Sequence, residues 1–71
     1  MSDVTALTKT VSRNLGSHMK EQGLSGRRMA DLSGLSQWTV SALLRCEHSP
    51  TIDSIYYLAH GLKIKPEELL K

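Results

Sequence analysis

One stretch of the sequence, LSQWTVSALLR at residues 35–45, places an unusual set of side chains on one side of a predicted helix. At about 100° per residue, Val40 and Leu43 fall together on the apolar side. The opposite side carries an amide, an indole, a hydroxyl, a methyl and a guanidinium, from Gln37, Trp38, Ser41, Ala42 and Arg45. Glutamine can bond adenine through two hydrogen bonds, arginine binds guanine or phosphate, and methyl groups contact thymine. These are the groups that read bases in the major groove of DNA.

A second predicted helix, GRRMADLS at residues 26–33, comes just before this one. Ser25 and Ser36 are the expected N-caps of the two helices, and Gly34 ends the first. Two short helices joined by a glycine-containing turn have the spacing of a helix-turn-helix. We therefore predict base contacts from residues of the later helix, Gln37, Trp38, Thr39, Ser41 and Ala42. The predicted phosphate contacts are Arg27, Arg28, Ser36 and Arg45, because basic residues and helix N-termini suit phosphate oxygens.

The rest of the chain predicts three more helices that support this pair. The first runs from about Asp3 to Gln22, with its apolar face formed by Val4, Leu7, Val11, Leu15 and Met19. The fourth follows Thr51 as N-cap, with Ile52 on its apolar face, and the fifth begins at Pro66. Leu69 is expected in the core with Leu15, Met29, Ala30, Val40, Leu43, Ile55, Leu58, Ala59 and Leu62. The prediction is an all-α domain of five helices spanning residues 1–71.

The composition of the chain indicates its cellular compartment and the class of partner that it binds. The chain has 71 residues, 39% of them hydrophobic, and its single Cys46 cannot form an internal disulfide, so it fits a reducing compartment, with the cytoplasm as the default. It has neither a signal-peptide pattern nor a membrane span, and we expect no membrane partner. The net charge is +2, but residues 9–45 hold six basic and two acidic residues, a local charge of +4. This asymmetry favours a polyanionic partner for the first two thirds of the chain.

Residues 23–70 resemble the DNA-binding domain of the phage repressor and Cro family, also called the xenobiotic-response-element repressor family. The resemblance rests on small and apolar anchors at Leu24-Ser25, Met29-Ala30, Gly34-Leu35-Ser36, Val40-Ser41, Leu43, Pro50, Ile52, Ile55, Leu58-Ala59, Leu62, Ile64 and Leu69-Leu70. With Asn14-Leu15 it extends over about residues 12–70, without a gap. It implies a compact five-helix, lambda-repressor-like domain that regulates transcription by binding a palindromic operator as a homodimer, with residues 36–45 in the major groove.

Three positions depart from the family pattern. Gly26 stands where the family often has a glutamine that bridges a phosphate and the recognition helix, so we expect that contact to be absent. Leu44 replaces a frequent glutamate. Cys46 replaces a frequent glycine just after the third helix, and we expect it to adopt a left-handed conformation that suits glycine better.

Other functions receive less support from the residues. Cys46 and His48 lack the four-ligand spacing of structural zinc, and no nucleophile triad or phosphate loop is present, so we predict no enzyme, no metal and no cofactor. With no further domain expected, no small-molecule ligand is predicted. The alternative is a helix-turn-helix adaptor or antitoxin that binds a partner protein through its exposed aromatic residues. Tyr57 and Leu70 are candidates for a dimer interface, although an exposed tyrosine and a core leucine would explain them equally well.

Overall fold

The computed structural model describes the backbone of residues 2–71 and the side chains of residues 6–71, so the prediction for the Val4 side chain lies outside the described residues. Its elements are α1 (Ser2–Gln22), α2 (Gly26–Ser33), α3 (Gln37–Leu44), α4 (Ile52–Leu62) and a 3-10 turn, η1 (Pro66–Leu69). Within residues 2–71 there is no strand. The all-α prediction is confirmed, but the domain has four α-helices there rather than five.

The last predicted helix is a 3-10 turn because its hydrogen bonds join residues three positions apart. The backbone N–H of Glu68 donates to the Lys65 carbonyl, and that of Leu70 donates to the Glu67 carbonyl. Pro66 and the acidic residues do start a helical turn, as the sequence indicates. Its four residues are too few to establish the α-helical pattern of bonds between residues four apart.

The predicted helix N-caps are all present. The hydroxyls of Ser25, Ser36 and Thr51 each accept a hydrogen bond from the backbone N–H three residues later, at 3.1, 3.0 and 3.0 Å. Each bond satisfies one of the N–H groups that a helix leaves free in its first turn. Local sequence therefore defines where α2, α3 and α4 begin.

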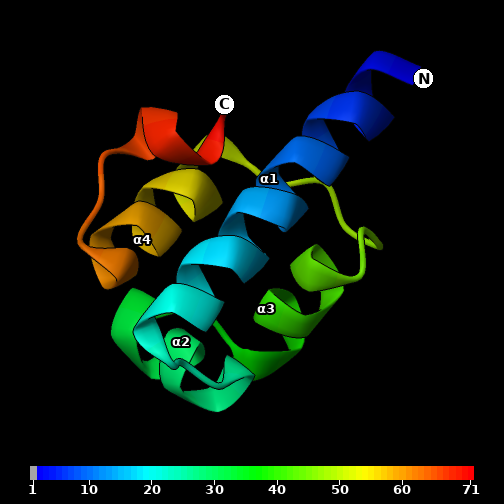
Figure 1. The fold of residues 1–71 in the computed structure, drawn as a ribbon. Helices are drawn as coiled ribbons and strands as arrows, with labels where there is room; N and C mark the ends of the chain where they lie inside the picture. The colour runs from blue at the N-terminus through cyan, green and yellow to red at the C-terminus, as the bar shows by residue number, and fades with distance from the viewer. Residues whose placement is uncertain (1) are drawn as a thin grey trace.

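The core lies between α1 and the other helices, and α1 crosses the domain with α2, α3 and α4 around it (Figure 1). The nine residues predicted for the core, and Leu69 with them, are all buried. No aromatic residue is among the buried side chains, and the three aromatic residues of the chain are all exposed. Aliphatic side chains and methionines therefore supply the apolar burial that stabilises the fold.

Two predicted apolar positions are not covered. Ile52, at the start of α4, is 83% exposed. It lies on the same side of the helix as Tyr56, which comes one turn later and is also exposed. Leu7 is exposed because the first turns of α1 extend past the rest of the domain (Figure 1). In both cases the helical period is correct, but no neighbouring element covers that part of the helix.

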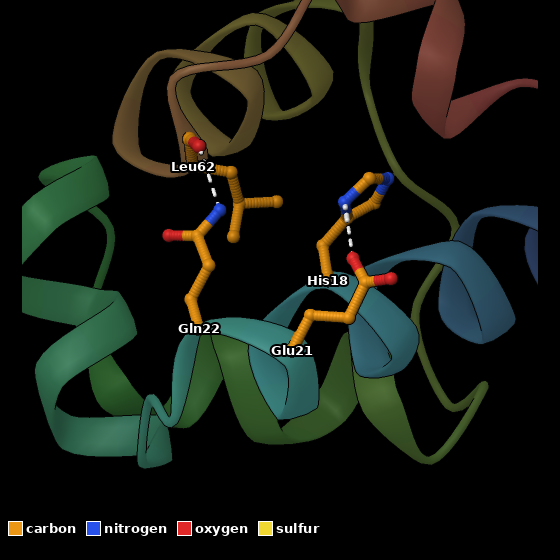
Figure 2. Close-up of polar contacts among 4 residues, drawn as sticks. All are labelled: His18, Glu21, Gln22 and Leu62. Atoms are coloured by element: carbon orange, nitrogen blue, oxygen red, sulfur yellow. Dashed lines mark hydrogen bonds and ion pairs between the residues drawn. The ribbon is translucent and has the colours of Figure 1, made fainter.

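Polar contacts attach α1 to the end of α4 and to the end of η1. The Gln22 side chain, in the last turn of α1, donates from Nε2 to the Leu62 carbonyl at the end of α4, at 2.8 Å (Figure 2). Asn14 Nδ2 donates to the Leu69 carbonyl at 2.9 Å. His18, which is half-buried, pairs with Glu21 one turn away, with Nδ1 and Oε1 3.6 Å apart (Figure 2). The first two contacts satisfy carbonyls at helix ends, where no intrahelical partner exists.

The backbones of α4 and α2 pass close to each other at Gly61. Gly61 is buried there, and a Cβ placed on it would lie 3.0 Å from the Leu32 carbonyl carbon and 3.0 Å from the Ser33 backbone nitrogen. A side chain at this position would therefore push against the backbone of α2. Gly61 thus sets the distance between α4 and the first helix of the helix-turn-helix.

Candidate nucleic-acid interface

The α2–turn–α3 unit presents the start of α3 to solvent. Gly34 ends α2 in a left-handed conformation, with φ of 82°, and its N–H donates to the Ala30 carbonyl. Leu35 is half-buried against the core and Val40 is buried, as expected for the two members of a hydrophobic staple. Ser36 then caps α3. The turn therefore fixes the direction of α3 from both its polar and its apolar sides.

The exposed side of α3 carries four of the predicted DNA-contacting residues. Gln37, Trp38 and Arg45 are exposed and Ser41 is half-buried. Trp38 is 67% exposed, unusually high for the only tryptophan of a small domain. The Gln37 side chain makes no hydrogen bond within the described part of the chain, so its amide donor and acceptor are free for a ligand.

The prediction that Ala42 lies on the exposed side of α3 is wrong, because this residue is only 1% exposed. It lies one turn after Trp38, and its carbonyl accepts a hydrogen bond from the Glu47 N–H at 2.9 Å. The chain thus turns back over Ala42 after α3 ends. In this conformation the Ala42 methyl group cannot reach a thymine, and its role is in packing.

The hydroxyls of Thr39 and Ser36 are already engaged with each other. Their oxygens lie 2.8 Å apart, and Ser36 Oγ also accepts the Thr39 N–H. Thr39 is half-buried, whereas Ser36 is exposed. Ser36 therefore retains access to a phosphate, while Thr39 offers a methyl group and a hydroxyl that is shared with the cap.

Positive charge is available beside α3. Arg27 and Arg28, in the first turn of α2, are exposed and form no ion pair among the described residues. Arg45 differs, because its Nε lies 3.1 Å from Glu47 Oε1, with both side chains more than half exposed. An exposed pair of this kind is weak, so it leaves the Arg45 guanidinium able to bind a phosphate as well.

The end of α3 adopts a Schellman motif. Cys46 donates its N–H to the Leu43 carbonyl, Glu47 donates to the Ala42 carbonyl, and Cys46 has φ of 60°. The left-handed conformation expected for Cys46 is confirmed. The bonds satisfy two carbonyls at the C-terminus of the helix, but a side chain at this φ is strained.

We expect Cys46→Gly to stabilise the domain by about 0.5–1 kcal/mol, because glycine adopts this φ without the steric penalty of a Cβ. Urea unfolding followed by circular dichroism would measure the change. Cys46→Val serves as the comparison and should destabilise the domain, since a β-branched residue tolerates positive φ least. Equal urea midpoints of unfolding for the glycine and valine variants would contradict the backbone strain inferred at Cys46.

Other kinds of site find no support in the described residues. No group of three or more His, Cys, Asp or Glu side chains within residues 6–71 is placed to hold a metal ion. None of the helices described there is both long enough and apolar enough to cross a membrane. An open hollow of about 240 Å³ lies beside α4, lined by Tyr56, Ala59, His60, Ile64 and Pro66.

The geometry of α2 and α3 agrees with a sequence comparison. The sequence profile of the HTH_3 helix-turn-helix family matches residues 17–69, most of the chain. The chain belongs to the HTH_3 family. HTH_3 proteins of this Cro/C1 type are DNA-binding transcriptional regulators rather than enzymes.

Individual HTH_3 relatives extend over most of the chain. An uncharacterized HTH-type transcriptional regulator, y4dJ, from Sinorhizobium fredii (strain NBRC 101917 / NGR234), is 33% identical over 64 residues, covering 90% of this chain and 83% of the relative. The restriction-modification controller protein C.AhdI from Aeromonas hydrophila has a similar structure, with a TM-score of 0.82 and 29% identity over 97% of this chain and 98% of that one. An HTH_3 family transcriptional regulator from Vibrio cholerae has a TM-score of 0.90 and 27% identity over 93% of this chain, which spans 37% of that protein.

Two neighbours of the exposed side of α3, Glu47 and His48, were not predicted from the sequence. Glu47 pairs with Arg45, and the His48 ring contacts Trp38. Both residues lie in the loop after α3, where no helical period predicts which way a side chain faces. The only signal in the sequence of this loop is its adjacent cysteine, glutamate and histidine, a combination that indicates candidate metal ligands rather than contacts with α3.

Proposed function

We propose that this HTH_3 protein is a small sequence-specific transcriptional regulator, of the Cro-like or controller kind, that binds a palindromic operator as a homodimer in the cytoplasm. The recognition helix α3 would enter the major groove of each half-site. The observation that carries the proposal is the exposed first turn of α3, where Gln37 and Trp38 face solvent while Val40 and Leu43 of the same helix are buried. The buried residues fix α3 against the rest of the domain, and its opposite side remains exposed for contact with DNA.

The roles proposed for the individual residues follow their exposure. Gln37 would read a base, with Trp38 and Ser41 contacting the groove beside it and Thr39 offering its methyl group. The phosphate contacts proposed are Arg27, Arg28, Ser36 and Arg45. Ala42 is left out of the reading set because it is buried.

The proposed homodimer would use exposed apolar residues of α4 and of the C-terminal turn. Tyr57 is 52% exposed and Leu70 is 45% exposed, so both can contribute apolar area to a subunit interface. A symmetric dimer places two copies of α3 about 34 Å apart, one turn of DNA, and this explains why a palindromic operator is expected. The controller protein C.AhdI, which is similar over nearly its whole length, supports a regulator of this size.

Selection of bound sequences from a random duplex pool tests the proposal directly. We expect an enriched site with two inverted half-sites whose centres lie about 10 base pairs apart. Analytical ultracentrifugation of the purified site with the protein should then show two chains per duplex. A single unrepeated half-site would overturn the dimer, and failure to enrich any sequence would overturn sequence-specific binding.

The adaptor alternative is favoured by one observation, that the three aromatic residues of the chain, Trp38, Tyr56 and Tyr57, are all exposed. An adaptor would bind a partner protein through such a surface and would have little affinity for DNA. Titration with random duplex DNA at increasing salt separates the two functions. A DNA-binding protein loses affinity steeply as salt rises, because cations are released from the duplex.

Replacing Arg27 or Arg28 with alanine should weaken specific and nonspecific DNA by similar factors and lower the salt dependence by about one ion. The reason is that a phosphate contact carries charge but no base preference. Lys65→Ala is the matched control, since Lys65 is an exposed basic residue whose side chain makes no capping bond. Loss of affinity at only one operator sequence would instead assign that arginine to base reading.

A further inference from the structure

The loop after α3 returns to the recognition surface. The Schellman bond from the Glu47 N–H to the Ala42 carbonyl, at 2.9 Å, turns the chain back along α3. This path brings the His48 ring beside Trp38, ten residues earlier in the sequence. The ring centroids are 6.1 Å apart and the ring planes meet at 87°, an edge-to-face contact. Aromatic rings favour this arrangement over a stacked sandwich.

The His48 ring bonds the backbone of its own loop, and the loop is attached to α1 on either side of it. Its Nδ1 lies 2.9 Å from the Ser49 carbonyl oxygen, and since a carbonyl only accepts, Nδ1 carries the proton in this contact. Thr8 Oγ1, on α1, donates to Ser49 Oγ at 3.5 Å. The Ser12 hydroxyl of α1 donates to the Leu44 carbonyl at 2.8 Å. Both ends of the turn after α3 are therefore attached to α1.

This arrangement restricts a side chain that would otherwise be free. Most of the Trp38 surface is exposed, and the His48 ring is the aromatic partner of its indole among the described residues. An exposed indole loses rotamer freedom when it binds a ligand, and a ring already held in one orientation loses less. The edge-to-face contact also leaves most of the indole available for another molecule.

We infer that His48 is a positioning residue for DNA recognition, holding the Trp38 indole in the orientation in which it meets the groove. This inference rests on the proposed function. His48 acts through Trp38, so its removal weakens operator binding only while Trp38 is present. The histidine thus makes the loop after α3 part of the reading surface without itself touching a base.

The first experiment measures Trp38 in the free protein. Trp38 is the only tryptophan of the chain, so time-resolved fluorescence anisotropy reports on this side chain alone. His48→Ala should increase the amplitude of fast local rotation, and His48→Phe, which keeps an aromatic ring, should restore the slower decay of the parent. Urea unfolding of each variant verifies that the domain remains folded. Unchanged Trp38 motion in a folded His48→Ala variant would overturn the inference.

The second experiment measures affinity for the selected operator in a double-mutant cycle. His48→Ala should weaken binding about 2- to 13-fold per half-site, the range that corresponds to the cost of ordering one side chain on binding, and His48→Phe should recover most of the loss. In a Trp38→Ala background, His48→Ala should have no further effect. An equal loss in both backgrounds would show a direct DNA contact and overturn positioning. A parent protein that selects no duplex overturns the proposed function itself, whereas a parent that binds DNA with no effect of His48→Ala overturns only this inference.

Discussion

Replacement of Gly61 by valine is expected to lower the free energy of unfolding by about 3 kcal/mol, at the upper end of the effects of overpacking. A Cβ at this position meets backbone atoms of Leu32 and Ser33 at 3.0 Å, and backbone cannot change rotamer to make room. Valine adds two methyl groups to that Cβ. The helices α2 and α4 would have to move apart, and the buried Met29 beside them would lose contacts. Urea unfolding monitored by circular dichroism measures the effect.

Gly16 provides the matched control for this prediction. It also lies within a helix, but a Cβ there would be 3.8 Å from Leu44 Cδ2, an ordinary contact. Gly16→Ala should therefore stabilise the domain by up to about 1 kcal/mol, the gain in helix propensity. Gly61→Ala should give a smaller loss than Gly61→Val. If Gly61→Val and Gly16→Ala were equally stable, the close approach of α2 and α4 would be contradicted.

Replacement of Gln37 by alanine should weaken operator binding by about 1–3 kcal/mol per half-site and relax the preference at one base pair of each half-site. The side chain is exposed at the start of the capped helix α3 and makes no hydrogen bond within the described residues. Its amide offers a donor and an acceptor together, which the edge of adenine requires. Affinities for a panel of operators with single base-pair substitutions measure both effects.

The arginine and tryptophan variants are the controls for Gln37. Arg28→Ala should lower affinity while leaving the base preference of the parent intact, because phosphate carries no sequence information. Trp38→Ala should also keep the adenine preference, since an indole has no acceptor for a bidentate pair. If Gln37→Ala retained the full base preference of the parent and Trp38 fluorescence did not respond to DNA, the adaptor function would become the better account.

Features of this protein that depend on nearby residues in the chain could be predicted from its sequence. Ser25, Ser36 and Thr51 cap helices because a hydroxyl reaches an N–H three residues away, whatever else the fold does. The helical period identified the buried positions in a similar way, because residues three or four positions apart lie on the same side of a helix. The helix-turn-helix, and membership of the HTH_3 family with it, follow from these local signals and their spacing.

Which side chains of each helix are buried could be learned only from the three-dimensional structure, because their burial depends on the path of segments that are distant in the sequence. Ala42 and Ile52 show both outcomes. The loop after α3 turns back over a predicted reading residue, and no element covers Ile52, which was predicted on the apolar face of its helix. The contact between Trp38 and His48 has the same origin, since the turn at Cys46 determines it. Gly61 is a glycine because two helix backbones meet there, and no pattern along α4 predicts how close α2 will lie.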